Sequence, residues 1–137
     1  MVGQGSRGTA VFVRGVAAWI ALVGLADIFL ALVWIDAGRS LPEVIRLPWS
    51  LTPRQLLLGG LAMGILALVT AAQLWRLVPS GRALGVVFLG IVSIWAAIEV
   101  YESPDAMSGI FAALNAWLAA QLLRRDAVRA CSGSRHA

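Results

Sequence analysis

The sequence predicts an all-α integral membrane protein, built as a four-transmembrane-helix bundle in a single transmembrane domain. Hydrophobic residues make up 60% of the 137-residue chain and charged residues 13%, and its mean hydropathy is +0.84. Soluble domains usually contain about 25% charged residues. Four apolar segments are long enough to span a bilayer, and the segments between them are rich in proline, glycine and arginine.

The first apolar segment constrains how the other helices pack. Its helix is expected at about 13–35, and the 21 residues between Arg14 and Asp36 contain one ionisable side chain, Asp27. Eleven of these residues are Val, Leu, Ile or Phe, each favouring insertion by about 0.3–0.6 kcal/mol, whereas a central Asp costs about 2.5–3.5 kcal/mol. The helix therefore inserts, but Asp27 needs a polar partner. The segment exceeds the roughly 7–15 apolar residues of a secretory signal peptide, so we expect a membrane anchor.

The other three helices are expected at about 54–75, 83–101 and 106–124. Pro79 and Gly81 predict a tight turn before the third helix. Ser103 or Asp105 is able to cap the fourth helix. A short mobile N-terminal tail precedes the helices, and a basic C-terminal tail follows them.

The connection from Asp36 to Gln55 contains three prolines, which exclude one continuous helix. Its apolar residues are interspersed with charged ones; they are Leu41, Val44, Ile45, Leu47 and Trp49. This pattern is typical of a short segment lying in the membrane interface. An ordinary polar loop with a few buried apolar contacts is the alternative.

Arginine placement predicts the orientation of the bundle. Eight of the eleven arginines lie on the side that would hold both termini, and three lie on the other side. Cytoplasmic loops carry an excess of basic residues, so we expect both termini in the cytoplasm of a bacterial-type cell, with the chain in its inner membrane. The net charge of +4 arises from arginines near helix ends, a distribution that argues against a nucleic-acid partner.

Two short similarities suggest an internal duplication. Ala71–Arg76 is similar to Ala119–Arg124, and Gly24–Phe29 is similar to Gly90–Trp95. A tandem repeat of two helical hairpins would be related by an axis along the membrane normal. Chance similarity in a sequence rich in alanine and leucine is the alternative, and the residues leave both interpretations open.

Polar side chains inside the helices are the candidates for a ligand-binding or ion-responsive site. Counting inward from the turns places Asp27, Ser93 and Asn115 near one depth, and we expect all three to face the bundle interior. One interpretation is a proton- or cation-responsive site on Asp27 that the other two side chains steady. The alternative is a carboxyl group that fixes the register between helices.

Glu99 is a fourth candidate and differs from Asp27 in depth by about 9 Å. It lies one turn inside the outer boundary, where Arg54 or Arg46 could reach it. A salt bridge at the rim is one interpretation. A carboxylate at the entrance for a cation is the other.

Small residues at helical spacing predict where helices approach closely. The candidates for helix packing are Gly60, Gly64, Ala112 and Ala116. Small side chains let two backbones come together in a membrane, and polar residues on the same face then bond across the interface.

The remaining residues argue against an enzyme that acts alone. Cys131 and His136 lie in the basic tail without an orienting partner, so we expect no metal site, no catalytic residue and no cofactor. Trp19, Trp95 and Trp117 lie deeper and could line a pocket for a quinone, a lipid tail or an aromatic drug. Packing or contact with lipid is the alternative.

In size, helix number and an acidic residue in the first helix, the chain is similar to the small multidrug transporters. Here the acid is Asp in a different local sequence, and the loop after the first helix is longer. We expect a non-catalytic accessory or assembly subunit of a larger membrane complex. Its partners would be the lipid bilayer and other membrane subunits or further copies of itself. The alternatives are a small proton- or cation-coupled transporter that uses Asp27 and a quinone- or lipid-binding membrane protein.

Overall fold

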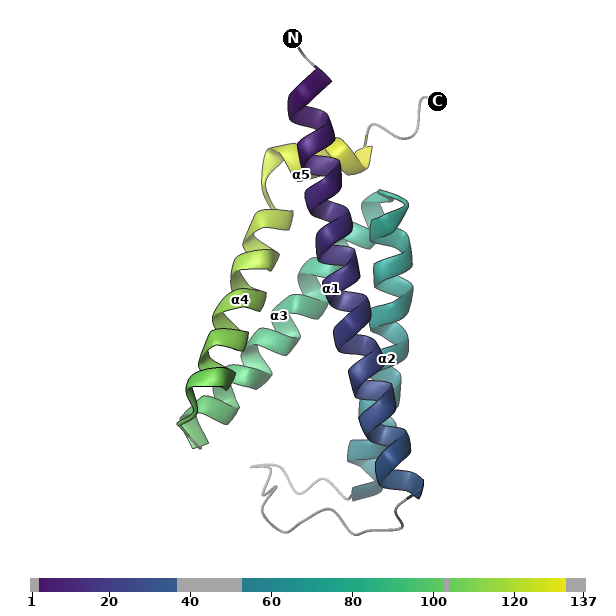
Figure 1. Ribbon diagram of the computed structural model, residues 1–137, viewed down its shortest axis with the longest axis vertical. Helices are drawn as coiled ribbons and strands as arrows, with labels where there is room; N and C mark the ends of the chain where they lie inside the picture. Colours follow the sequence, from purple (N-terminus) through teal and green to yellow (C-terminus); the bar gives the residue numbers. More distant parts are fainter. Residues whose placement is uncertain (1–2, 37–52, 103, 133–137) are drawn as a thin grey trace.

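Figure 1 shows the computed structural model of the chain, in which residues 3–36, 53–102 and 104–132 are described. The helices are α1 (Gly3–Asp36), α2 (Pro53–Trp75), α3 (Pro79–Glu102), α4 (Ala106–Leu122) and α5 (Arg125–Ser132). The described ranges contain no strand. The segment that we interpreted as interfacial, with Leu41 and Trp49, lies outside them.

Three helices are long and apolar enough to cross a membrane. Their candidate spans are Arg7–Val33 in α1, Leu57–Trp75 in α2 and Pro79–Glu102 in α3. α4 has 17 residues and is therefore about 26 Å long, slightly less than the hydrocarbon core of a bilayer at about 30 Å. α4 and α5 pass the same test together, but they are bent by 62°. Within residues 3–36, 53–102 and 104–132, length and composition thus give three candidate spans, or four if this bent pair counts as one.

The structure differs from the sequence prediction at both ends of the chain. α1 begins at Gly3 rather than near residue 13, and the tail after α4 forms α5 as far as Ser132. An isolated helix of eight residues is marginal in water. Ala127 and Cys131 of α5 are buried in the same apolar cluster as Val13 of α1, so packing against α1 stabilises the additional helix.

α1 and α2 approach each other closely at two glycines. A Cβ atom on Gly24 would lie 2.5 Å from the Cβ of Ala67, and one on Gly64 would lie 2.5 Å from Cγ1 of Ile28. The Gly64 Cβ would also lie 2.8 Å from the carbonyl oxygen of Gly24. A side chain at either position would therefore push the helices apart, as expected for small-residue packing in membranes.

The turn between α2 and α3 depends on Leu77 and on Gly81, where an added Cβ would lie 2.6 Å from the carbonyl carbon of Gln73. The amide of Val78 donates to the carbonyl of Gln73 at 3.0 Å, and the amide of Leu77 donates to the carbonyl of Leu74 at 2.9 Å. These two bonds form a Schellman cap, which places Leu77 in the left-handed region with φ of 56°. α3 then begins at Pro79, four residues before its predicted start at residue 83, because proline fits the first helical turn.

α3 and α4 form the second hairpin. Asp105 has an extended backbone, and its carboxylate accepts a 3.0 Å hydrogen bond from the backbone amide of Ser108. Asp105 is therefore the N-cap of α4. Arg82 of α3 donates to the carbonyl of Leu122 at 3.4 Å, near the C-terminus of α4. α4 ends at Leu122, two residues earlier than predicted.

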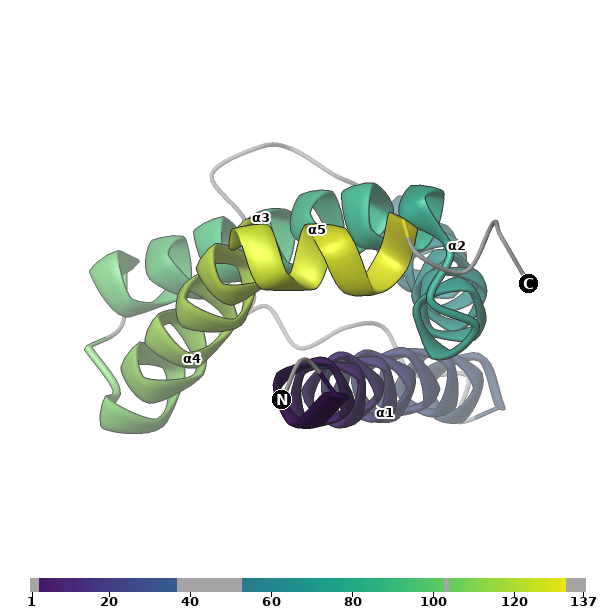
Figure 2. The same cartoon turned by 90° about the horizontal axis from the view of Figure 1, so that it is seen from above.

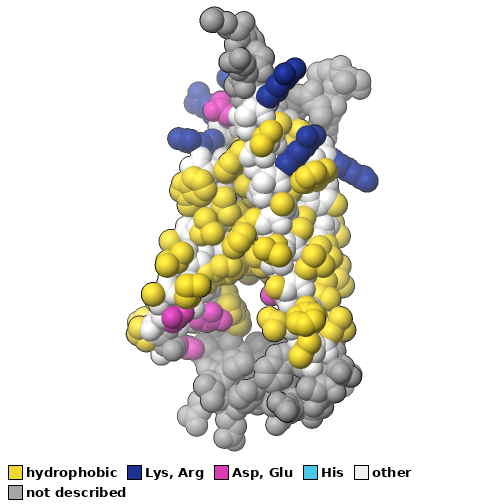
Figure 3. Space-filling model, in the orientation of Figure 1, with side chains coloured by type: hydrophobic (Ala, Val, Ile, Leu, Met, Phe, Trp, Pro, Cys, Tyr) yellow, Lys and Arg dark blue, Asp and Glu magenta, His cyan; other side chains and the backbone are white. Residues whose placement is uncertain are grey.

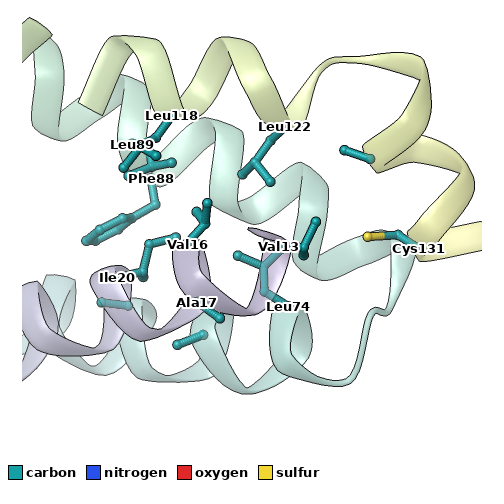
Figure 4. Close-up of a cluster of buried hydrophobic side chains, with 13 residues drawn as sticks. Val13, Val16, Ala17, Ile20, Leu74, Phe88, Leu89, Leu118, Leu122 and Cys131 are labelled. Atoms are coloured by element: carbon teal, nitrogen blue, oxygen red, sulfur yellow. The ribbon is translucent and has the colours of Figure 1, made fainter. Parts of the chain in front are cut away.

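The apolar core lies toward one end of the molecule, where both hairpins and α5 meet. Figure 4 shows side chains from all five helices converging there, and it labels Val13, Ile20, Leu74, Phe88, Leu122 and Cys131 among them. Figure 2 shows α5 crossing this end over α3, with α1 beside it. At the opposite end the α1–α2 and α3–α4 hairpins diverge (Figure 1).

Charge also distinguishes the two ends. The end with the core carries Arg7, Arg14, Arg76, Arg82, Arg124, Arg125 and Arg129 and is called here the arginine end. Figure 3 shows the basic side chains gathered there, whereas most acidic side chains lie toward the other end. The Arg14 guanidinium lies 5.8 Å from the ring centroid of Trp75, so it remains at this surface through a cation–π contact.

Candidate functional site

Asn115 is fully buried, with 0% of its side chain exposed, and it joins α4 to α1. Its Oδ1 accepts a hydrogen bond from Nε1 of Trp19 at 3.1 Å. Its Nδ2 donates to the carbonyl oxygen of Phe111, one turn earlier in α4, at 2.7 Å. Both ends of the amide are thus bonded, which is the usual condition for a buried polar group. Asn115 is held as a link between two helices.

Aromatic contacts flank this hydrogen bond. The rings of Trp19 and Phe111 have centroids 6.0 Å apart at 50° to each other, and those of Phe12 and Trp117 are 6.1 Å apart at 88°. Phe12 and Trp19 are seven residues apart and therefore lie on one face of α1. The sequence left open whether Trp19 and Trp117 line a ligand pocket or pack against other helices. In the structure both rings make contacts between α1 and α4, and Trp117 also borders a groove at the surface.

Ser93 links the two helices of the second hairpin. Its hydroxyl donates to the carbonyl oxygen of Ala112 at 2.9 Å. A serine bonded in this way satisfies its own hydroxyl and ties α3 to α4. Ala112 is half-buried at this contact, whereas Ala116 is exposed. Of the four residues that we assigned to helix packing, Gly64 makes the tightest approach, and a Cβ on Gly60 would lie 3.9 Å from the Cβ of Ala31.

Asp27 is half-buried and takes no part in the described hydrogen bonds of Asn115 and Ser93. It follows Trp19 by eight residues and so lies about 12 Å farther along α1 than the residue that Asn115 contacts. Counting from the turns assumed parallel helices, but the hairpins are inclined to each other (Figure 1). Within the described ranges no hydrogen bond or ion pair reaches the Asp27 carboxylate. The described hydrogen bonds therefore join Asn115 and Ser93 to neighbouring helices and do not include Asp27.

Asp27 lies on the same face of α1 as residues that this helix contributes to the core. Val16 and Ile20 are buried on this face, and Asp27 follows Ile20 by two turns. Toward the C-terminal end of α1 the α3–α4 hairpin diverges from it (Figure 1). The face that is buried near the arginine end thus becomes only half-covered where it carries a carboxylate.

A matching face of α3 carries Glu99. Phe88 is buried, Val92 packs against the core, and Trp95 and Glu99 continue the same face toward the end of the helix. Trp95 donates from Nε1 to the carboxylate of Glu99 at 3.0 Å, and both side chains are exposed. The expected ion pair from Arg54 or Arg46 lies outside the described side chains.

Asp27, Trp95 and Glu99 thus lie where the inner faces of the two hairpins separate, and we call this region the acidic recess. Figure 3 shows a notch between the two limbs of the molecule, with acidic side chains on both of them. A carboxylate beside hydrocarbon is unfavourable unless a donor or a cation meets it. The chemistry that suits the recess is binding of a cation or of a hydrogen-bond donor.

Two other polar groups in the core were not singled out from the sequence as site residues. Thr70 is fully buried, and its hydroxyl lacks a hydrogen-bond partner in the part of the chain that the structure describes. Cys131 is buried under α5, where burial raises the pKa of its thiol and the charge of Arg82 partly lowers it. Among the described residues no three His, Cys, Asp or Glu side chains form a group that could hold a metal ion.

The chain matches no protein-family model, and neither a curated protein nor a solved structure resembles it significantly.

Proposed function

We propose that the chain is a non-catalytic subunit of a larger membrane complex and that a transmembrane helix of a partner occupies the acidic recess. One observation carries this proposal. The core-facing surfaces of α1 and α3 continue beyond the core to Asp27 and Glu99, where the described part of the chain leaves the first half-buried and the second exposed. In a bundle that is complete by itself, such surfaces would meet each other.

The two carboxylates define the partner helix. A central Asp facing lipid costs about 2.5–3.5 kcal/mol, so an occupant that brings an Arg, Lys or amide side chain to this depth recovers part of that cost. Glu99 near the mouth of the recess adds attraction for the same cation. The proposed partner is therefore a mostly apolar helix with one basic or amide residue.

The proposed orientation places the arginine end in the cytoplasm of a bacterial-type cell, with the chain in its inner membrane. Seven of the described arginines support it, because basic residues are retained on the cytoplasmic side. Asp27 and Glu99 would then lie in the half of the membrane that faces away from the cytoplasm.

Site-specific crosslinking in native membranes tests the subunit proposal. A photo-crosslinking residue at Trp95, inside the recess, is compared with one at Ile94, which is exposed on another face of α3. We expect Trp95 to crosslink to one defined transmembrane helix, and Ile94 to show no protein product. The Asp27→Leu substitution should abolish the crosslinked product. The Asp27→Lys substitution should abolish it too, and an acidic residue introduced on the partner helix should restore it. Equal crosslinking from both positions, or rescue by no partner substitution, would refute a dedicated helix site.

A second candidate function is transport coupled to a proton or a cation. The observation that favours it is the placement of Asp27 and Glu99 on opposite hairpins of the same recess. Flux into liposomes that contain only the purified chain separates the two functions. Transport predicts pH-dependent flux that Asp27→Asn removes, and the subunit proposal predicts no flux above that of empty liposomes.

A further inference from the structure

A groove at the arginine end is separate from the acidic recess. It has a volume of about 360 Å³ and lies between the beginning of α1, the end of α4 and the beginning of α5. The side chains that matter for its chemistry are Thr9, Phe12, Trp117, Gln121, Arg124 and Asp126. Gly8 also borders it, and an added Cβ there would meet nothing within 4 Å, so this wall is open.

The groove presents two opposite charges. Arg124 follows the end of α4 and Asp126 lies in the first turn of α5, and both are exposed. Within the described chain neither takes part in an ion pair, so both charges are available to a ligand. An anion would satisfy Arg124 alone, and a cation would satisfy Asp126 alone. A zwitterion satisfies both.

Polarity also changes along the depth of the groove. The edge-to-face pair of Phe12 and Trp117 lines its deeper part, toward the middle of the helices. Gln121 lies one turn nearer the arginine end, about 6 Å from Trp117 along α4, and Arg124 follows it. The apolar rings thus lie toward the middle of the helices and the charges toward the arginine end. A phospholipid places its acyl chains and its headgroup in the same order.

We infer that the groove binds a phospholipid whose zwitterionic headgroup carries a primary amine, as in phosphatidylethanolamine, from the leaflet at the arginine end. Arg124 binds the phosphate, because guanidinium groups suit phosphate geometry. The Asp126 carboxylate and the Gln121 carbonyl accept hydrogen bonds from the ammonium group. A volume of about 360 Å³ equals roughly a dozen water molecules, which is ample for such a headgroup.

Hydrogen bonding separates this lipid from its nearest analogue. A choline headgroup has the same charges, but its quaternary nitrogen carries no hydrogen and cannot donate to Asp126 or Gln121. A glycerol headgroup keeps the phosphate and lacks the cation. The groove should therefore prefer ethanolamine over choline and glycerol lipids of identical acyl chains, by about tenfold for the loss of a charge-assisted hydrogen bond.

Native mass spectrometry of the full chain in detergent measures these preferences with phosphatidylethanolamine, phosphatidylcholine and phosphatidylglycerol as the probes. Asp126→Asn should reduce the ethanolamine-to-choline ratio from about ten toward one, and Arg124→Gln should weaken both lipids about tenfold. Arg125→Gln is the matched control, because Arg125 is exposed beside Arg124 and does not line the groove. It should leave all three affinities unchanged.

Other outcomes would overturn the inference. Equal loss of binding in the Arg124 and Arg125 variants, with the glycerol lipid bound most tightly, would show general attraction of anionic lipid to the arginine end. Because Asp126 also lies at the N-terminus of α5, its substitution could undock that helix and expose Cys131 to alkylation. If the Asp126 variant undocks α5, Gln121→Met on α4 is the second variant, and it should also lower the ethanolamine-to-choline ratio. A ratio that it leaves unchanged would exclude the ammonium site.

Discussion

Replacing Gly64 by alanine should weaken the contact between α1 and α2 by an amount that follows from its geometry. The new Cβ would lie 2.5 Å from Cγ1 of Ile28 and 2.8 Å from the carbonyl oxygen of Gly24. The Ile28 side chain can rotate, but the Gly24 carbonyl belongs to a helix backbone, so the two helices must separate. Overpacking of this kind costs about 1–3 kcal/mol, partly offset by the roughly 0.5–1 kcal/mol by which alanine is preferred to glycine in a helix.

Gly59 provides the matched control on the same helix. It is exposed, and an added Cβ would meet nothing within 4 Å, so Gly59→Ala should gain only the helix preference, about 0.5–1 kcal/mol. Reversible unfolding in mixed micelles of a mild detergent and dodecyl sulfate, followed by far-ultraviolet circular dichroism, measures both variants. We expect the two substitutions to change the free energy of unfolding with opposite signs. A Gly64→Ala variant as stable as Gly59→Ala would refute the close contact.

Three further predictions concern buried groups in the core. Trp19→Phe should lower the free energy of unfolding by about 1–3 kcal/mol because it leaves Oδ1 of Asn115 buried without a donor. Trp117→Phe removes no described hydrogen bond and should therefore lower the free energy of unfolding by less. Combining Trp19→Phe with Asn115→Leu should recover part of the loss, because the buried acceptor is then removed as well. Burial raises the pKa of Cys131 above its ordinary value of 9.0, so its alkylation in the folded chain at pH 8 should be far slower than that of a cysteine placed at exposed Ser132 in a Cys131→Ala background. The raised pKa also means that the folded state keeps its proton longer than the unfolded state, so this group's contribution to stability declines as the pH rises through 9.0. Equal alkylation rates at the two positions, or equal losses from the two tryptophan variants, would contradict these assignments.

The sequence predicted an all-helical protein because several separate apolar segments each indicate a long helix. Long apolar runs bounded by arginine and proline leave few alternatives to membrane-length helices, and three helices meet that criterion. The approach of α2 to α1 at Gly64 follows from the same reasoning, since a glycine on an apolar helix face has a steric purpose.

Tertiary geometry limited the prediction of the site. The depths of Asp27 and Asn115 were counted along straight, parallel helices, whereas the two hairpins are inclined to each other (Figure 1). The bond from Trp19 to Asn115 joins residues 96 positions apart, and such a pair leaves no local signal in the chain. Its only trace is that Phe12 and Trp19 share one face of α1.

α5 was missed because its own sequence does not favour a helix strongly enough. Its eight residues bury Ala127 and Cys131 in a core to which the other helices contribute, and such tertiary packing leaves no signal in the local sequence. The Schellman cap at Leu77 was missed for a different reason. Sequence rules expect glycine where φ is positive, and here a leucine adopts φ of 56°.

Because the core lies at one end, the α1–α2 and α3–α4 hairpins are joined there and separate toward the other end, like two limbs. Each limb is a tightly joined hairpin, and the fulcrum lies among the side chains around Leu89 and Ile20. From Leu89 to the tip of α3 is about 20 Å, so a rotation of about 10° at the fulcrum displaces that tip by about 3 Å without breaking a contact inside either limb. Such a rotation would move the two hairpins against each other where the core residues of α1 and α3 meet.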